Sequence, residues 1–174
     1  MSAPDQSDAT IGALSLPAQI HATAVVLGEC GVLIKGASGS GKSSLARKLL
    51  ALSRQRGDFS CLIGDDIIRI AQAGRHLLAK PHPAIPGQME VRGLGILNFM
   101  QEPAAILHCV IDLEGTPAGG VDLPRVPENT DSYSRFGGLL LPRLRLLASR
   151  SPVDNAEVTL LFLEHILVPC CQVT

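Results

Sequence analysis

The sequence predicts an α/β domain with a mixed sheet and flanking helices, and three observations lead to this fold class. A β-rich run at residues 31–35 leads into a glycine-rich loop at 36–43, and an amphipathic segment at 43–53 follows. A second β-rich run at 20–27 lies only three residues before the first, which is typical of a hairpin and makes the two strands antiparallel. The 174 residues are 46% hydrophobic and 18% charged, as expected of one globular domain with a sizeable core.

Composition and charge exclude several classes of protein. The net charge is −1, there is no basic block and only 3% of residues are aromatic, which argues against nucleic acid as the main partner. No apolar run approaches the roughly 20 residues that cross a membrane, and the polar N-terminus lacks the pattern of a signal peptide. The five cysteines are odd in number, which favours reduced thiols in a cytoplasmic protein. We expect residues 1–17 to be a flexible leader and residues 18–174 to be a single domain.

The glycine-rich loop fits the P-loop pattern G-x-x-x-x-G-K-[ST] over residues 36–43. Its glycines allow the backbone to wrap a phosphate with N–H groups pointing inward, and the following helix adds the positive end of its dipole. In this pattern Lys42 reaches the β- and γ-phosphates and the Ser43 hydroxyl ligates Mg²⁺. The residues expected to bind the nucleotide are Gly36, Ala37, Ser38, Gly39, Ser40, Gly41, Lys42, Ser43 and Ser44.

A pair of carboxylates, Asp65 and Asp66, follows the short apolar run at residues 60–64. A carboxylate at the end of a strand near a P-loop is well placed to bind Mg²⁺ or to accept a proton. Two adjacent carboxylates repel each other and usually need a cation or a shared proton, so a functional pair is favoured over a solvated turn.

The rest of the chain reads as strands, turns and one helix. Pattern and turn residues predict a hairpin of strands 67–71 and 76–79, an irregular proline-rich stretch at 81–87, a central strand at 107–113, an edge strand at 141–146 with Pro142 at its start, and a helix at 154–168 after Ser151-Pro152.

The segment EVRGLGILN at residues 90–98 is a β-like run interrupted by Gly93 and Gly95. Glycine in such a run predicts a bulge or the close approach of a backbone or ligand. In an extended strand Glu90 and Arg92 would lie on the same face, and the simplest interpretation is a surface ion pair.

Three landmarks together resemble the catalytic domain of HPr kinase/phosphorylase: the P-loop at residues 36–43, Gly64-Asp65-Asp66, and the segment at 90–98, which is similar to that family's signature. A hairpin opened by His21 before the loop matches as well. The resemblance runs from about Ile20 to Asp112 and is weaker towards the C-terminus. It implies that the domain at residues 18–174 is a P-loop kinase domain of the HPr kinase/phosphoenolpyruvate carboxykinase type. It implies an ATP- and Mg²⁺-dependent protein serine kinase that phosphorylates HPr, the small phosphocarrier of the bacterial phosphotransferase system.

The resemblance also implies roles for particular residues. Lys42 and the loop would hold ATP, Ser43 and Glu90 would hold Mg²⁺, and the Asp65-Asp66 pair would supply the base. His21 matches the family's active-site histidine, and Arg92 would steady the transferring phosphate. The family's Arg-Pro-Gly-Arg-Asn type loop, which is tied to dephosphorylation, is not visible in this sequence, and Arg143 and Arg145 are the nearest basic residues.

Several alternatives stay open at this point. The chain resembles the short proteobacterial form of the family, and long relatives assemble as hexamers, which makes a homo-oligomer an expectation without defining an interface. Which aspartate is the base, and whether the site also dephosphorylates HPr, is left open. A small-molecule P-loop kinase and a nucleotide-binding regulatory module without transfer activity are the competing functions.

Overall fold

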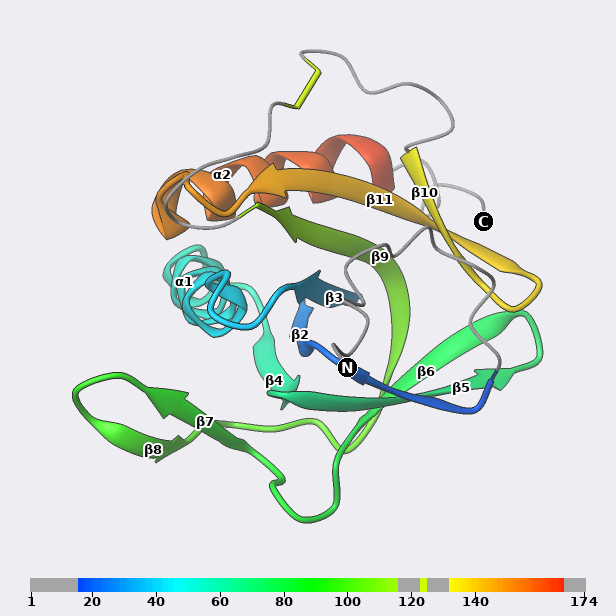
Figure 1. Ribbon diagram of the computed structural model, residues 1–174, viewed down its shortest axis with the longest axis horizontal. Coiled ribbons are helices and arrows are strands. Elements are labelled where there is room, and N and C mark those ends of the chain that lie inside the picture. Colours follow the sequence, from blue (N-terminus) through cyan, green and yellow to red (C-terminus); the bar gives the residue numbers. More distant parts are fainter. Residues whose placement is uncertain (1–15, 116–122, 125–131, 168–174) are drawn as a thin grey trace, which may run out of the picture.

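The computed structural model describes residues 16–115, 123–124 and 132–167. Figure 1 shows a curled sheet with helices α1 and α2 on the same side of its central strands, which confirms the α/β class with a mixed sheet. The strands are β1 (Ala18–His21), β2 (Thr23–Leu27), β3 (Cys30–Gly36), β4 (Ser60–Gly64), β5 (Ile67–Ala73), β6 (His76–Pro81), β7 (Gln88–Val91), β8 (Gly95–Asn98), β9 (Ala105–Glu114), β10 (Tyr133–Phe136) and β11 (Leu139–Leu147). The helices are α1 (Lys42–Gln55), α2 (Pro152–Phe162) and the π-helical turn η2 (Leu163–Leu167).

Strand β9 is the centre of the sheet, as the sequence predicts. The order is β1-β5-β6-β9-β3-β2-β4, and β9 pairs in parallel with β3 along one edge. Its other edge is shared, because β6 pairs antiparallel with the start of β9 and β11 pairs in parallel with its end. The sheet therefore forks at β9, and both parallel and antiparallel pairs meet on this strand.

Alternation along the central strands builds a core on each face of the sheet. In β2 and β3, Val25 and Val32 face the helices, whereas Ala24 and Leu33 face the strands β5 and β6. The helix-side core includes Leu45, Leu49 and Leu50 of α1, Cys109 and Ile111 of β9, and Ala156 and Leu160 of α2. The strand-side core includes Ile63, Ile68, Ile70, Leu77, Leu107, Val110 and Phe136. Both faces of the loop-bearing strand are thus buried, which fixes the position of the loop.

The predicted hairpins are present, with adjusted limits. Strands β2 and β3 pair antiparallel, but the run at 20–27 is divided at Ala22, because β1 pairs with β5 whereas β2 pairs with β3 and β4. Strands β5 and β6 form the second hairpin, with Gly74 at φ 59° in its turn. Helix α1 begins one residue before and ends two residues after the predicted helix.

The expectation of a bulge or of a closely approaching backbone in the segment 90–98 is wrong. The segment is a hairpin of β7 and β8, and Gly93 and Gly95 have φ of 83° and 87°. No atom lies within 4 Å of a Cβ added at either glycine, so backbone conformation, and not close approach, favours glycine there. Arg92 lies in the turn after β7 and does not share a strand face with Glu90.

The C-terminal part differs in detail from the prediction. Pro142 is the fourth residue of β11, at the point where the partner changes from β10 to β9, so a missing N–H is tolerated there. Helix α2 begins at Pro152, and the Ser151 Oγ accepts a hydrogen bond of 3.1 Å from the Asp154 backbone N–H. The predicted leader up to residue 15 and the last predicted helical residue, 168, lie outside the described residues. Within the described part of the chain, no helix has the length and apolar character needed to cross a membrane.

Candidate functional site

The loop between β3 and α1 has the backbone conformation that a phosphate cradle requires. Gly36 has φ 149°, and a Cβ there would lie 2.7 Å from the Leu113 backbone oxygen, so the loop leaves the sheet where only glycine fits. Gly41 precedes α1 in the left-handed region with φ 98°. The first N–H groups of a helix have no partner within the helix and carry partial positive charge, so this end of α1 is suited to an anion.

Lys42 is buried beneath this loop. Its Nζ donates to the backbone oxygens of Gly36 at 3.0 Å and Ala37 at 2.9 Å. Burial lowers the pKa of Lys42, whereas the nearby charges of Asp65 and Asp66 raise it and so oppose the effect of burial. These two carbonyl oxygens hold the ammonium group at the loop. Charged phosphate oxygens would form stronger hydrogen bonds with it and could replace them.

Asp65 connects the loop helix to the sheet. The side chain is buried, with 8% exposure, and its carboxylate accepts hydrogen bonds from Thr23 Oγ1 at 2.5 Å and from Ser43 Oγ at 2.9 and 3.0 Å. Thr23, with no exposed surface, was not predicted as a site residue. Its signal in the sequence is weak: it is a single hydroxyl inside an otherwise apolar strand.

Asp66, the next residue of the same turn, has a different side-chain partner from Asp65. Asp66 is the one non-glycine residue with positive φ in the described part of the chain, at 71°. Its backbone oxygen accepts from the Ala22 N–H at 3.1 Å, and its Oδ1 lies 2.6 Å from His21 Nε2. Half or more of each side chain is exposed. The break between β1 and β2 and the turn after β4 therefore bring the predicted histidine and carboxylate together.

One cavity of about 980 Å³ joins these parts. Each predicted catalytic or metal-binding residue lines it, and so do most of the predicted loop residues, whereas Gly36 and Ala37 do not. The lining residues of the sequence prediction are His21, Ser38, Gly39, Ser40, Gly41, Lys42, Ser43, Ser44, Asp65, Asp66, Glu90 and Arg92. The site residues are thus gathered from β1, the loop, the end of β4 and the β7–β8 hairpin.

The cavity has a second wall that the sequence did not indicate. Residues 148–152, between β11 and α2, line it together with Arg47 and Asn155. In the described part of the chain, Arg47 Nε, Asn155 Oδ1 and the Ser40 Oγ of the loop are buried without a hydrogen-bond partner. Arg150 lies in the turn, where its backbone N–H donates to the Leu147 oxygen at 3.1 Å.

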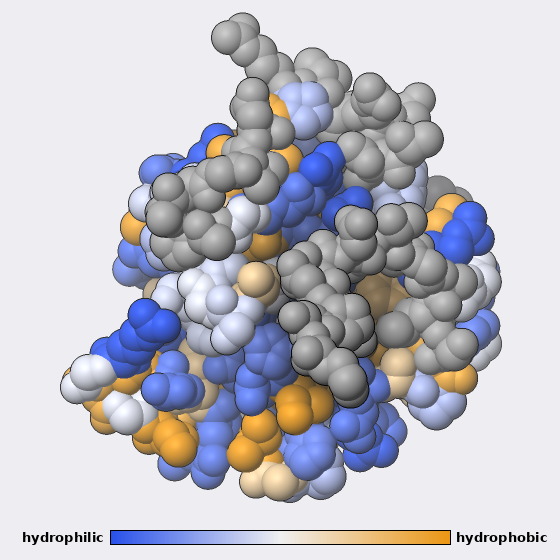
Figure 2. Space-filling model, viewed as in Figure 1, coloured by the Kyte–Doolittle hydropathy of each residue, from blue (hydrophilic) through white to orange (hydrophobic). Residues whose placement is uncertain are grey.

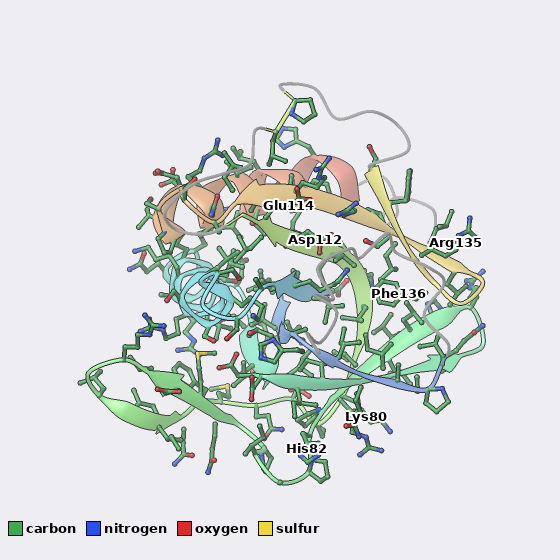
Figure 3. The ribbon with its side chains drawn as sticks, in the orientation of Figure 1. Lys80, His82, Asp112, Glu114, Arg135 and Phe136 are labelled. Carbon is green, nitrogen blue, oxygen red and sulfur yellow. The ribbon has the colours of Figure 1, made fainter. Side chains whose placement is uncertain are left out.

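Arg143 and Arg145, the C-terminal arginines named in the sequence analysis, form ion pairs with carboxylates of β9. Figure 3 shows Asp112 and Glu114 on β9 beside β11. Arg143 pairs with Asp112 and lies 3.3 Å from Glu114, and Arg145 donates to Glu114 at 2.5 and 2.7 Å. Neither arginine lines the cavity, whereas Arg150 does. Arg143 and Arg145 therefore connect the parallel strands β9 and β11 and are not part of the cavity.

No three His, Cys, Asp or Glu side chains come together as a metal site among the described residues. Ser43, Asp65 and Glu90 nevertheless present hard oxygen atoms to the same cavity. This donor set fits Mg²⁺, which proteins commonly bind through one or two carboxylates while substrate phosphates and water complete its shell.

A strand, a glycine-rich loop and a helix, with carboxylates at the end of a neighbouring strand, define a P-loop domain of the α/β class. The chain belongs to the family described as the HPr serine kinase C-terminal domain, whose family model matches residues 12–103. The family expected from the three sequence landmarks is therefore confirmed.

Individual relatives agree with this family. The chain is 33% identical over 121 residues to an HPr kinase/phosphorylase of Mycoplasma mycoides subsp. mycoides, which covers 69% of this chain and 36% of that protein. It is 33% identical over 155 residues to an HPr kinase/phosphorylase of Aromatoleum aromaticum, which covers 84% of this chain and 47% of that protein. The chain thus matches less than half the length of both relatives.

A solved structure has the same fold. The HPr(Ser) kinase/phosphatase from Coxiella burnetii superposes with a TM-score of 0.61 at 23% identity, over 82% of this chain and 93% of that chain. This likeness confirms the predicted fold class of a kinase domain with a mixed sheet.

Proposed function

We propose that this domain transfers the γ-phosphoryl group of ATP to a serine hydroxyl of HPr, with Mg²⁺ as cofactor, in the bacterial cytoplasm. The observation that carries the proposal is a single cavity lined by the loop helix, the Asp65-Asp66 pair and Glu90, in a chain of the HPr serine kinase family. Phosphoryl transfer needs little covalent chemistry from a protein and relies on positioning and charge stabilisation, which these groups supply.

The residues divide between binding and charge stabilisation. The loop N–H groups and Lys42 bind the phosphate oxygens, and Ser43 and Glu90 hold Mg²⁺, with Asp65 fixing the Ser43 hydroxyl through its hydrogen bonds. Bound Mg²⁺ supplies charge neutralisation on the phosphates. Arg92, in the hairpin turn at the cavity, adds a cation for the transferring group.

In the transfer step, one aspartate of the pair accepts the proton of the serine hydroxyl. The serine oxygen forms a bond to the γ-phosphorus while the bond from that phosphorus to the β–γ bridging oxygen breaks, so that phosphoserine and ADP result. His21 Nε2 lies 2.6 Å from Asp66 Oδ1 and orients the Asp66 carboxylate. A general base of this kind contributes about 10²- to 10⁴-fold to the rate.

A phosphotransfer assay tests the proposal. Purified protein is incubated with γ-labelled ATP, Mg²⁺ and HPr of the same organism, and label on HPr is expected. Lys42→Ala should reduce the rate by about 10²-fold or more, because it removes a cation from the developing charge. Lys48→Ala is the matched control, since Lys48 is a half-buried lysine of the same helix that does not line the cavity.

Other results would favour the competing functions. Label on a metabolite of a test panel, with none on HPr, would indicate a small-molecule kinase. ATP binding without transfer to either would indicate a nucleotide-binding regulatory module. A Lys42→Ala protein that labels HPr at the wild-type rate would contradict the site itself. Release of label from phosphorylated HPr tests whether the same site also dephosphorylates HPr.

A further inference from the structure

The turn between β11 and α2 forms a wall of the cavity that the transfer step does not use. The carboxyl ends of three neighbouring parallel strands lie side by side beneath it. Gly36 of β3 is the register partner of Leu113 on β9, and Leu113 is in turn the partner of Leu146 on β11. The Ala148 N–H donates to the Glu114 backbone oxygen at 2.8 Å and fixes the turn to the end of β9. Ligands of α/β sheets bind at such carboxyl ends.

The strand order gives the two sides of the cavity different neighbours. On one side of β3, strands β2 and β4 lead to Asp65 and Asp66, where the acceptor hydroxyl is proposed to react. On the other side, β9 and β11 lead to the turn at residues 148–152, which lies two strand spacings, about 10 Å, from the start of the loop. A nucleotide whose γ-phosphate faces the carboxylates therefore has its nucleoside on the side of this turn.

The loop has no side chain suited to distinguishing one base from another. Its exposed residues Ser38 and Gly39 are small, and Figure 2 shows pale, near-neutral atoms where Figure 1 draws the chain leading into α1. A loop of this kind binds phosphates through backbone N–H groups, and the phosphates are the same in every nucleotide. Selection of the base therefore depends on another wall of the cavity.

Asn155 of α2 presents an unused hydrogen-bond acceptor at that wall. Its side chain lines the cavity and is 3% exposed, and in the described part of the chain its Oδ1 is buried without a hydrogen-bond partner. Its Nδ2 donates to the Leu147 backbone oxygen at 3.0 Å, which fixes the orientation of the amide, because exchanging the two atoms would place Oδ1 against that oxygen. A buried acceptor without a donor is unfavourable, so Asn155 indicates a ligand that supplies a donor.

The chemistry of this wall favours adenine over an anion. Ionised phosphate has no donor for the Asn155 oxygen, whereas the exocyclic amine of adenine is a donor on the rim of a flat ring. The ring nitrogens of adenine are acceptors, and the Arg47 Nε of α1, at the same cavity, is a buried donor without a partner among the described residues. Leu113 and Ala148 are buried and line the cavity, so they offer apolar surface to the ring.

We propose that the wall formed by Arg47, Ala148 and Asn155 is the base subsite of the kinase, and that Asn155 makes it selective for adenine. The adenine amine donates to Asn155 Oδ1 while the loop binds the phosphates. This inference rests on the proposed function, because it needs a nucleotide on the loop. It adds a choice of nucleotide that the loop alone does not make.

Calorimetric titration with nucleoside diphosphates and Mg²⁺ tests the subsite without turnover. ADP and purine riboside 5′-diphosphate differ only in the amine, and IDP has a carbonyl oxygen in its place. For wild-type protein, the expected Kd of each analogue is about tenfold or more above that of ADP, which corresponds to about 1.4 kcal/mol. This comparison needs no variant, so it does not depend on the folding of an altered protein.

Asn155→Leu keeps the approximate size of the side chain and removes the acceptor. The Kd values of ADP and the two analogues should then lie within about twofold of each other, and the Kd of inorganic tripolyphosphate, the probe for the loop alone, should be unchanged. Thr159→Val is the matched control. Thr159 Oγ1 donates to the Asn155 backbone oxygen at 2.8 Å but does not line the cavity, so this variant weakens the same helix and should retain the preference for ADP.

The outcomes separate this inference from the proposed function. If ADP binds with the expected preference but HPr receives no label from ATP, the proposed function fails and the base subsite stands. If wild-type protein binds the analogues as tightly as ADP, as a contact of Asn155 with the ribose would give, the base subsite is overturned and the proposed function stands. Asn155→Leu protein that still prefers ADP, or that loses as much affinity for tripolyphosphate as for ADP, would also overturn the subsite.

Discussion

Asp65 receives two hydroxyl hydrogen bonds from different parts of the chain, and this residue shows how the site is tuned by single side chains. Thr23 Oγ1 donates from strand β2, and Ser43 Oγ donates from helix α1. A hydrogen bond to an ionised group contributes about 1.5–3 kcal/mol to stability, more than one between neutral groups. The Thr23 hydroxyl therefore both stabilises the fold and fixes the carboxylate that holds Ser43 in place.

Thr23→Val tests this positioning role. The two side chains have nearly the same shape, so the change removes one donor to Asp65, and we expect the free energy of unfolding to fall by about 1–3 kcal/mol. We also expect a lower kcat for HPr phosphorylation with little change in KM, because Asp65 and Ser43 are less well oriented. Urea unfolding and initial-rate kinetics measure the two effects.

Two further variants separate positioning from stability. Thr159→Val removes another buried hydroxyl, which donates to the Asn155 backbone oxygen at 2.8 Å in α2, and it should affect stability but not kcat. Thr23→Ser keeps the hydroxyl and should restore kcat. Equal kcat values for the Thr23→Val and Thr159→Val proteins would rule out the positioning role.

At the scale of elements, the pairing of β3 with β9 is irregular at one position, where a histidine side chain accepts a backbone hydrogen bond. Gly31 pairs with Leu107 and Val32 with Cys109, so His108 is an extra residue on β9. The Gly31 N–H donates to His108 Nδ1 at 3.0 Å, and a Cβ at Gly31 would lie 2.1 Å from the Ile106 backbone oxygen. The ring thus satisfies a buried backbone donor just where the chain begins the strand that carries the loop.

The His108 ring predicts a pH dependence of stability. Burial lowers the pKa of His108 from its ordinary value of 6.5; His76 lowers it further, while the Ile106 backbone hydrogen bond and Glu29 oppose the shift. Because the unfolded chain binds the proton first as the pH falls, this contribution is fully present above about pH 6.5 and is lost as the pH drops below it. Protonation of Nδ1 would also break the bond from Gly31.

His108→Asn provides the measurement. The Asn oxygen can still accept from Gly31 but does not titrate, so its free energy of unfolding should fall less between pH 7.5 and 5.5 than that of wild-type protein. Urea unfolding at several pH values gives this difference, and His165→Asn, an exposed histidine of η2, is the control that should follow wild type. Parallel losses in wild type and His108→Asn would contradict the assignment.

At the scale of the whole molecule, local pattern predicted the parts of the site but not all of its contacts. The strand, loop and helix around Lys42 and the carboxylates after β4 depend on neighbours in sequence, so they could be predicted. The contact of Thr23 with Asp65 spans 42 residues, and the pairing of Arg143 with Asp112 spans 31. Such contacts depend on which strands become neighbours, and sequence periodicity does not specify this.

The cavity wall between β11 and α2 shows the same limit. Arg150 lines the cavity because β11 pairs with the end of β9 and α2 packs against α1. Conversely, Arg143 and Arg145 looked available in the sequence, but the carboxylates of β9 bind them. Side-chain charge alone could not distinguish a cavity arginine from one that joins two strands.

Because elements from both ends of the described chain line one cavity, ligand binding should stabilise the domain as a whole. His21 lies on β1, Lys42 on α1, Glu90 on β7 and Arg150 after β11. A ligand at 100 times its Kd adds about 2.7 kcal/mol to the free energy of unfolding. For a domain of this size, that corresponds to a rise in Tm of roughly 5–10 °C.

Thermal unfolding with and without Mg²⁺ and ATP checks this expectation. Wild type and Lys48→Ala should show the full rise in Tm, whereas Lys42→Ala should show little at the same ATP concentration, because in the proposed site the Lys42 ammonium binds the phosphates. ATP with a chelator in place of Mg²⁺ should give a smaller rise in Tm. Without the cation, the Glu90 carboxylate repels the phosphates and Ser43 has no metal ion to bind. Equal rises for Lys42→Ala and wild type would mean that ATP stabilises the fold from somewhere other than this cavity.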